Sequence, residues 1–347
     1  MIKFLNIKNF TEFNEACFEF SKGLNVVIGE NSTGKSHLLK LAYAIAYVWH
    51  EAKGEQQEKP GQISSGGSES WWQSRLAEKL VNVFKPDRLG RLYRLGLGHK
   101  EVEIEISNAD CAIKFNFSET SKTQVKLIQK PSCFPSKKPI FFPAKEILSF
   151  FPGFTALYDE RILAIEETYY DLCKTLSNPL LKKPDSSLIE PLEKIMGGQV
   201  KLESNRFFIH FPKGNLEIFL VAEGIRKVAM LTYLIANGSL KKGSTFFWDE
   251  PEANLNPKLI KYVAGSLLQL AEKGVQIILA THNLFLMKEL SLQVDNVPAR
   301  FFSLVQGEEG VKVESGERLP DLQTIVALDE ELAFFDREQA AFYAGKQ

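Results

Sequence analysis

A glycine-rich segment near the amino terminus has the composition of a phosphate-binding loop. Residues 29–36 read Gly-Glu-Asn-Ser-Thr-Gly-Lys-Ser and match the pattern G-x-x-x-x-G-K-[ST] at every fixed position. In such a loop the backbone N–H groups point at phosphate oxygens, and the positive end of the following helix faces them as well. Lys35 is expected to reach the β- and γ-phosphates, and Ser36 to ligate Mg²⁺. The sequence therefore predicts that ATP and Mg²⁺ bind at this loop and the residue after it: Gly29, Glu30, Asn31, Ser32, Thr33, Gly34, Lys35, Ser36 and His37.

Two adjacent carboxylates follow a much later apolar segment. Residues 245–250 read Thr-Phe-Phe-Trp-Asp-Glu, so Asp249 and Glu250 stand at the end of a strand that we expect to be buried. Asp249 is placed to hold the Mg²⁺ shell, and Glu250 to orient and deprotonate the attacking water. The alternative is an ordinary acidic turn after a core strand. A phosphate-binding loop in the same chain favours the catalytic interpretation.

A polar pair ends another apolar segment, one strand and one helix further along the chain. Residues 276–282 read Gln-Ile-Ile-Leu-Ala-Thr-His. His282 is placed to hydrogen-bond the γ-phosphate and to respond to its presence. A lone histidine is more often an ordinary surface or core residue. Its position one strand and one helix after the acidic strand favours the catalytic role.

These motifs together resemble the ABC-type ATPase heads of the SMC, RecF and OLD-like group, which is labelled AAA-15 or AAA-21 in bacteria. The matching segments are 7–10, 29–36, 249–257 and 281–283. The resemblance implies an α/β fold with a mixed N-terminal β lobe, a small helical insertion and no long coiled coil. It also implies Mg²⁺-dependent ATP hydrolysis and head-to-head homodimers or higher homo-oligomers. In such a dimer, a signature helix of one subunit caps the ATP held by the other.

The resemblance assigns the signature role to the helix that begins near residue 223. Gly224 and Lys227 are the implied nucleotide contacts there, and Asn254 stands at the D-loop that crosses between the two sites. The family carries Ser-Gly-Gly where this chain has Ala-Glu-Gly at 222–224, so the serine hydroxyl is missing. Either Lys227 or Arg226 compensates for it, or the site hydrolyses ATP slowly. The alternative is that this segment is only an amphipathic core helix.

A second departure follows the strand expected at 140–142. The family has a glutamine after this strand, and here Pro-Ala-Lys-Glu stands at 143–146. Lys145 or Glu146 is therefore the candidate for sensing Mg²⁺.

The motifs must be positioned by strands and helices that alternate along much of the chain, as in a parallel α/β core. Strands are expected at 2–8, 15–20, 24–29, 101–107, 111–117, 124–129, 140–142, 198–203, 206–211, 215–220, 245–249, 275–280, 300–305 and 310–314. Helices are expected at 35–49, 71–83, 155–196, 224–238, 258–273, 284–291 and about 328–343, with breaks in the third at Pro179, Pro184 and Pro191. We expect three regions: an N-terminal ATPase lobe at 1–150 with a polar and basic insertion at 52–100, a helical insertion at 151–197, and a C-terminal ATPase lobe at 198–347.

The bulk composition is that of an ordinary globular protein. The 347 residues carry a net charge of −1, so no overall positive field attracts nucleic acid. The most apolar stretch of helix length, 38–49, contains Lys40 and is too short to span a bilayer, and no signal peptide is expected. The four cysteines show no C-x-x-C pair and are expected to be free thiols in the cytoplasm: Cys17, Cys111, Cys133 and Cys173.

One segment is locally basic. Residues 73–100 hold seven basic side chains against two acidic ones. The basic residues are Arg75, Lys79, Lys85, Arg88, Arg91, Arg94 and Lys100. Spacing by three would place Arg88, Arg91 and Arg94 on one face of a helix, where they could contact nucleic-acid phosphates. Several glycines make a regular helix doubtful, so a solvated insertion or a protein-docking edge is the alternative.

Two functions are compatible with these observations. The first is a switch ATPase that assembles on ATP and controls a separately encoded effector, a nuclease or a toxin, as ATPase subunits of bacterial anti-phage systems do. The second is a RecF-like ATPase of DNA repair or maintenance that clamps duplex DNA directly. We favour the first, because the sequence shows no nuclease motif of its own and the altered signature suits a slow cycle that holds a state.

Overall fold

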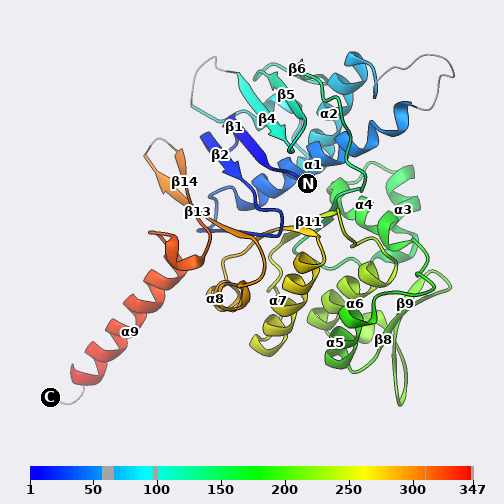
Figure 1. Cartoon of the computed structure of the whole chain (residues 1–347), viewed down its shortest axis with the longest axis vertical. Helices are drawn as coiled ribbons and strands as arrows, with labels where there is room; N and C mark the ends of the chain where they lie inside the picture. Colours follow the sequence, from blue (N-terminus) through cyan, green and yellow to red (C-terminus); the bar gives the residue numbers. More distant parts are fainter. Residues whose placement is uncertain (57–65, 97–100, 309, 345–347) are drawn as a thin grey trace.

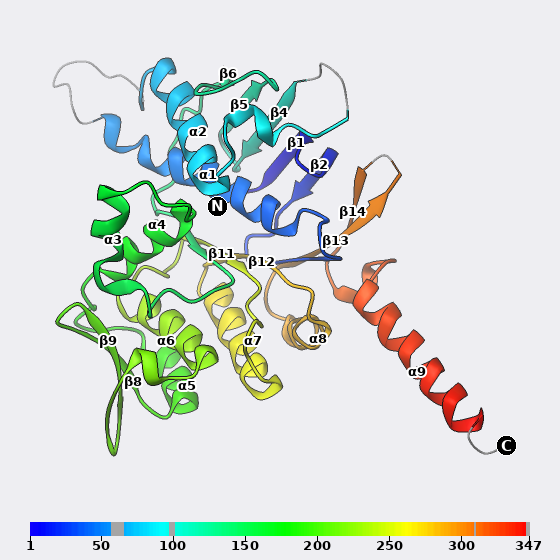
Figure 2. The same cartoon turned by 180° about the vertical axis from the view of Figure 1, so that it is seen from behind.

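The computed structural model describes residues 1–56, 66–96, 101–308 and 310–344. Within these residues the strands form three sheets, and helices pack against them (Figures 1 and 2). The fold is of the α/β class, as the sequence predicts.

A six-stranded sheet lies at the centre of the molecule. Its order is β14 (Gly310–Gly316), β13 (Ala299–Gly307), β3 (Leu24–Gly29), β12 (Gln276–Ala280), β11 (Thr245–Asp249) and β7 (Ile140–Phe142). All neighbours from β13 to β7 are parallel, and β14 pairs antiparallel at the edge. Every residue of β11 and β12 is buried, which is typical of parallel strands covered on both faces.

The two faces of this sheet belong to two hydrophobic clusters. On one face, Phe247 packs with α1 (Lys35–Glu51). On the other, Phe246 and Trp248 pack with α6 (Glu223–Ala236), α7 (Pro257–Glu272) and α8 (Leu284–Gln293). Successive side chains of a strand point to opposite faces, so a continuous apolar run at 246–248 supplies both clusters.

A second, antiparallel sheet covers α1 from the other side, at the top of Figure 1. Its order is β2 (Phe13–Glu19), β1 (Phe4–Phe10), β4 (Val102–Ser107), β5 (Ala112–Phe117) and β6 (Lys126–Gln129). In β4 buried and half-buried residues alternate, as expected for a sheet with one face on a core. The helix α2 (Glu69–Phe84) packs between this sheet and α1.

The region expected to be one interrupted helix at 155–196 contains three separate helices. They are α3 (Phe151–Glu160), α4 (Glu167–Leu176) and α5 (Ser186–Met196). Pro179 and Pro184 lie in the connection before α5, as predicted. Pro191 was expected to break a helix, and this expectation is wrong, because α5 continues through it. A small antiparallel sheet follows, formed by β8 (Gln199–Glu203), β9 (Arg206–Phe211) and β10 (Gly214–Glu217).

The last helix, α9 (Val326–Ala344), projects away from the body of the molecule (Figures 1 and 2). None of its residues is buried. Among the described residues, no helix combines the length and the apolar character that a bilayer span requires.

The expectation of four free thiols is wrong for two of the cysteines. Cys111, at the start of the β5 hairpin, forms a disulfide with Cys133 beyond β6, with the two Cα atoms 6.0 Å apart. The two cysteines are 22 positions apart, and the chain between them returns to the same place, which the spacing alone does not reveal. Cys17 is exposed and free, and Cys173 is buried and free.

Candidate nucleotide site

The segment 29–36 forms a tight loop between β3 and α1, and its glycines stand where side chains would not fit. Gly34 has a φ of 87° and is the N-cap of α1. A Cβ at Gly34 would lie 3.0 Å from the ring of Phe13, and a Cβ at Gly29 would lie 2.5 Å from the carbonyl oxygen of Leu304. The loop therefore requires glycine at both positions, for conformation as well as for space.

Lys35 lies over the loop that precedes it. Its ammonium donates hydrogen bonds to the carbonyl oxygens of Gly29 at 2.8 Å and Glu30 at 2.6 Å. The side chain is buried, and burial lowers the pKa of Lys35, while the carboxylates of Glu250 and Asp249 oppose that change. A cation buried in this position is held where a loop of this type presents its lysine to phosphate.

The remaining loop residues differ in their surroundings. Thr33 is buried and donates to the Glu30 carbonyl oxygen at 2.9 Å. Asn31 and Ser32 are exposed at the tip of the loop. The sequence groups His37 with the nucleotide contacts, but its ring packs edge-on against Phe84 of α2. Only its backbone remains at the helix N-terminus.

The two predicted Mg²⁺ ligands, which are 213 residues apart in sequence, meet in the structure. The Ser36 hydroxyl lies 3.0 Å from Oδ1 of Asp249. Parallel β3 and β11 end at the same edge of the sheet, and α1 begins there, so topology brings the two oxygens together. Burial raises the pKa of Asp249 to about 6, and the hydrogen bond from Ser36 opposes this rise.

Glu250, the predicted base, follows β11 with a left-handed backbone, φ 49°. Its carboxylate is partly exposed, and its Oε1 lies 3.5 Å from Nδ1 of His282. Glu252 is buried behind them and accepts hydrogen bonds from the Thr281 hydroxyl at 2.7 Å and the His282 backbone N–H at 3.3 Å. The carboxyl end of β12 is thereby tied to the turn after β11, which holds Glu250 and His282 side by side.

The signature residues lie against the same turn within one chain. A Cβ at Gly224 would lie 2.4 Å from the Asn254 carbonyl oxygen, so α6 and the predicted D-loop are in contact. Asn254 is exposed, with a left-handed φ of 64°. Lys227 is fully buried and donates to the Glu250 carbonyl oxygen at 3.1 Å. Burial lowers the pKa of Lys227 to about 8, while Glu252 and Glu223 oppose the change.

The two residues considered as substitutes for the missing serine hydroxyl are both engaged inside the chain. Lys227 makes the contact just described. Arg226 donates to the Val221 carbonyl oxygen at 2.7 Å and forms an ion pair with buried Glu146 at 2.8 Å. Glu146 also accepts hydrogen bonds from Ser149. The segment after β7 is thus joined to α6 by a charged pair.

Two residues near the site were not predicted from the sequence. Glu166, the residue before α4, accepts a hydrogen bond at 2.5 Å from Lys40, which lies on α1 one turn beyond Ser36. Burial raises the pKa of the Tyr169 phenol, and the carboxylates of Glu166 and then Asp249 raise it further. No local motif marks these residues, because they reach the site only through the packing of α4 against the core.

The arrangement fits ATP and Mg²⁺ by two observations made on this structure. The glycine positions leave no room for side chains at the loop, which is what close approach of phosphate to the backbone requires. A hydroxyl and a buried carboxylate lie within hydrogen-bond distance, and the charge on that carboxylate is disfavoured by burial. A divalent cation would stabilise the charge there.

The basic segment does not form the predicted single face. Only residues 89–92 make a short 3₁₀ turn, so Arg88, Arg91 and Arg94 do not share a helix. Lys79 cannot contact nucleic acid, because it is fully buried on α2. Its ammonium pairs with Asp171 at 2.5 Å and with Glu167 at 3.2 Å.

The other basic residues of the segment differ in exposure. Arg75 is half-buried and binds Glu51 at 2.6 Å, whereas Lys85, Arg88 and Arg91 are exposed. Lys100 lies outside the described residues.

The fold and the site together resemble an ABC-type P-loop ATPase head. The phosphate-binding loop after β3, the carboxylates at the end of β11 and the histidine after β12 lie together at one edge of a mostly parallel sheet. Residues 141–288 match the AAA_21 family of AAA domains, whose description names the AbiEii toxin of a type IV TA system. A stretch of 112 residues is 25% identical to the DNA replication and repair protein RecF of Limosilactobacillus fermentum. It covers 32% of this chain and 25% of RecF, so the match spans a quarter of that relative's length.

Solved structures support the fold over nearly the whole chain. An SMC head bound to the C-winged helix domain of ScpA is 16% identical and covers 93% of this chain and 99% of that one, with a TM-score of 0.59. The Pyrococcus furiosus Smc head with an extended coiled coil, bound to the C-terminal domain of ScpA, is also 16% identical. It covers 97% and 99% of the two chains, with a TM-score of 0.57. In its motifs and in these matches the chain is similar to the ABC-type SMC/RecF-like ATPases, and its fold is that of an SMC head.

Proposed function

We propose that this chain is a Mg²⁺-dependent ATPase that acts as a nucleotide-driven switch. It would pair head to head and control a separately encoded effector, a nuclease or toxin, in anti-phage defence. The observation that carries the ATPase part is the contact between Ser36 and Asp249, with Glu250 next in sequence and His282 beside it.

The roles of the residues follow from this geometry. Bound Mg²⁺ would neutralise phosphate charge, with Ser36 and Asp249 as its protein ligands. Lys35 and the loop N–H groups would hold the phosphates. Glu250 would orient and deprotonate the attacking water, and its partial exposure leaves it accessible to solvent. His282, 3.5 Å from Glu250, would hold that carboxylate in position and hydrogen-bond the γ-phosphate.

Assembly and control of an effector are inferred from the matched proteins. Both matched SMC heads are bound to a domain of ScpA. The AAA_21 description names a toxin system. We extend both features to this chain. Asn254 is exposed and lies against buried Gly224 at the start of α6. We propose that two heads meet through the surface around Asn254.

The test of ATPase function compares turnover in the parent, Glu250→Gln and Lys35→Ala. We expect Glu250→Gln to bind ATP with Mg²⁺ as tightly as the parent and to lose turnover by about 10² to 10⁴-fold, because general-base catalysis is removed. Lys35→Ala should lose tight binding. Equal turnover in Glu250→Gln and the parent would show that the assigned base is wrong.

A RecF-like function in DNA maintenance is the second candidate, and the RecF match favours it. It predicts that duplex DNA stimulates ATP turnover and that binding weakens steeply with salt. Exposed Arg88 and Arg91 are the first residues to replace. Slow ATP turnover that is the same with and without duplex DNA at two salt concentrations would favour the switch function instead.

A further inference from the structure

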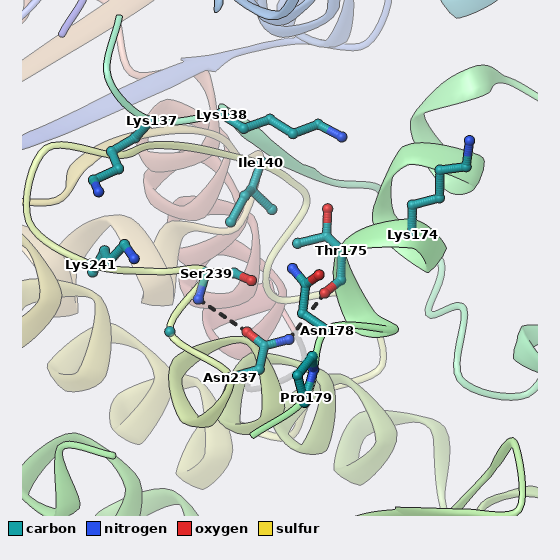
Figure 3. Close-up of a pocket in the computed structure, with 11 residues that line it drawn as sticks. Lys137, Lys138, Ile140, Lys174, Thr175, Asn178, Pro179, Asn237, Ser239 and Lys241 are labelled. Atoms are coloured by element: carbon teal, nitrogen blue, oxygen red, sulfur yellow. Dashed lines mark hydrogen bonds between the residues drawn. The ribbon is translucent and has the colours of Figure 1, made fainter. Parts of the chain in front are cut away.

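A pocket of about 470 Å³ lies at the opposite end of the central sheet from the nucleotide site. Its lining comes from three places: the segment leading into β7, the end of α4, and the end of α6 with the loop that follows it. Figure 3 shows the residues that line it. The predicted nucleotide site stands at the carboxyl ends of the parallel strands, whereas Ile140 in this pocket begins β7.

Four lysines line the pocket, and no carboxylate does. In Figure 3, Lys137 and Lys241 stand on one side and Lys138 and Lys174 on the other. Within the described residues, none of the four has an ion pair with a carboxylate. Two of them contact aromatic rings instead. The Nζ atom of Lys138 lies 4.6 Å from the ring centroid of Tyr47, and that of Lys174 lies 4.2 Å from the ring centroid of Tyr170.

A carboxylate behind the pocket, that of Asp171, already has partners within the protein. Asp171 is buried and binds the ammonium of Lys79 and the hydroxyl of Tyr43. Burial lowers the pKa of Lys138. The carboxylate of Asp171 opposes this change, and the ammonium groups of Lys79 and Lys174 add to it. The pKa of Lys174 is raised, chiefly by its hydrogen bond with Tyr170, so Lys174 keeps its positive charge at the pocket.

Helix ends reduce this positive charge but do not cancel it. The helices α4 and α6 both end at the pocket, and each C-terminus carries roughly half a negative charge. Together they offset about one of the four lysine charges. One carbonyl group at the end of α4 already has a hydrogen-bond partner, because the Asn237 amide donates to the Thr175 carbonyl oxygen at 3.0 Å (Figure 3). The pocket keeps an excess of about three positive charges.

We propose that this pocket binds a phosphate-bearing small molecule with at least two negative charges. Its volume lies within the usual range for small-molecule sites, roughly 300–1,000 Å³. Lysines act as point-charge ligands for phosphate. Asn178 and Ser239 offer polar groups, and Ile140 and Pro179 offer an apolar wall for the uncharged part of the ligand. A nucleic-acid backbone needs a groove open along its length, which a pocket bounded by three segments of the chain does not supply.

The two helices also link the pocket to the nucleotide site. Glu166, before α4, binds Lys40 of the P-loop helix, and Lys174 lies in the last turn of α4. Lys227, near the start of α6, binds the Glu250 carbonyl oxygen, and Asn237 caps its end. A 10-residue and a 14-residue helix separate the two sites by about 15 to 20 Å. The sites are distinct, so a ligand in the pocket does not compete for the loop.

Calorimetric titration with inorganic pyrophosphate tests the proposal. The protein should carry Lys35→Ala, which removes the phosphate-binding lysine of the loop. We expect saturable binding at one site. Lys137→Gln with Lys241→Gln should weaken it about tenfold, because two of four charges are lost. Asn178→Asp should weaken it about fivefold by adding a negative charge at an exposed position.

The matched control removes two exposed lysines elsewhere, Lys122→Gln with Lys126→Gln, and should leave the affinity unchanged. Thermal unfolding checks that all variants fold. Absence of saturable binding in the Lys35→Ala protein overturns the proposal, as does equal weakening by the control pair. A 12-nucleotide single strand that binds more tightly than pyrophosphate through the same lysines would identify a nucleic-acid surface and overturn the small-molecule assignment.

Discussion

At the scale of single residues, the site depends on buried charges that are held by few partners. Lys227 is the clearest case, because it is fully buried and its ammonium donates to the backbone carbonyl oxygen of Glu250. Asp249 is buried beside the Ser36 hydroxyl. Burying charges of this kind lowers the stability of the protein when no ligand is bound. Their presence is therefore better explained by function than by stability.

The cost of the Lys227 charge should depend on pH. Its pKa is lowered to about 8 in the folded chain from an ordinary value of 10.5, so between these values the unfolded chain binds more protons. The contribution of Lys227 to the free energy of unfolding of the parent therefore rises with pH across that window. Lys227→Met removes the titration. Its stability relative to the parent should fall by about 2 kcal/mol between pH 7 and pH 9.5.

Urea unfolding at the two pH values measures this difference. The control is Lys258→Met, which removes an exposed lysine of α7. A difference between Lys227→Met and the parent that stays constant with pH would mean that the ammonium is not buried as described.

Gly224 supports a second residue-scale prediction. A Cβ there would lie 2.4 Å from the backbone of Asn254, so Gly224→Ala must displace α6 or the turn after β11. We expect a loss of about 1–3 kcal/mol in unfolding free energy. A Cβ at Gly265, inside α7, would meet no atom nearer than 3.8 Å, and Gly265→Ala should gain about 0.5–1 kcal/mol. Equal effects of the two substitutions in chemical denaturation would contradict the close approach.

At the scale of elements, α4 and α6 matter because they reach from the candidate nucleotide site to the lysine pocket. The helix α4 contacts α1 through a buried cluster in which Asp171 binds Lys79 and Tyr43. Its first turn approaches Lys40, and its last turn lines the lysine pocket. Helix α6 likewise runs from the acidic strand to that pocket. Elements outside the motifs therefore decide how the site is supported.

The helix α9 differs from all these, because its large apolar residues are exposed. Leu332, Phe334, Phe335, Phe342 and Tyr343 are 54–67% exposed. Ending the chain after Glu331 keeps the ion pair of Glu331 with Lys288 and removes these side chains. The melting temperature should change by less than about 2 °C, because no buried residue is lost. Self-association at high concentration should decrease, since exposed apolar patches promote it.

Differential scanning calorimetry and light scattering measure the two outcomes. A drop of more than about 5 °C would show that α9 packs on the body in solution. An ordinary surface change, Glu338→Gln within the helix, serves as the control.

At the scale of the whole molecule, the switch function requires two heads to meet when ATP is bound. Glu250→Gln with ATP and Mg²⁺ should have about twice the mass of the nucleotide-free chain in light scattering coupled to size exclusion, because nucleotide is held and not consumed. Lys35→Ala should keep one mass under both conditions. His282→Ala should form less of the larger species, since one contact to the γ-phosphate is lost. One unchanged mass for Glu250→Gln would contradict head-to-head pairing.

Local sequence patterns were sufficient to predict the fold class and the motif residues of the site. Gly29, Lys35 and Ser36 are recognisable because a phosphate-binding loop is contiguous, and its glycines are required by local backbone geometry. Asp249 and His282 are recognisable because each follows a short apolar strand segment. Parallel strands in one sheet end at one edge, so these patterns were enough to predict that the groups converge.

The partners of the charged residues that face inward could be read only from the packed molecule. Lys79 belongs to a basic stretch of sequence, yet Leu76, Lys79, Leu80 and Val83 share the buried face of α2. Helical spacing carried that signal, but the partner of the lysine, Asp171, lies 92 residues away and could not be foreseen. The disulfide between Cys111 and Cys133 and the pocket of four lysines arise in the same way. Contacts between distant segments depend on how the elements pack, and local spacing does not encode that packing.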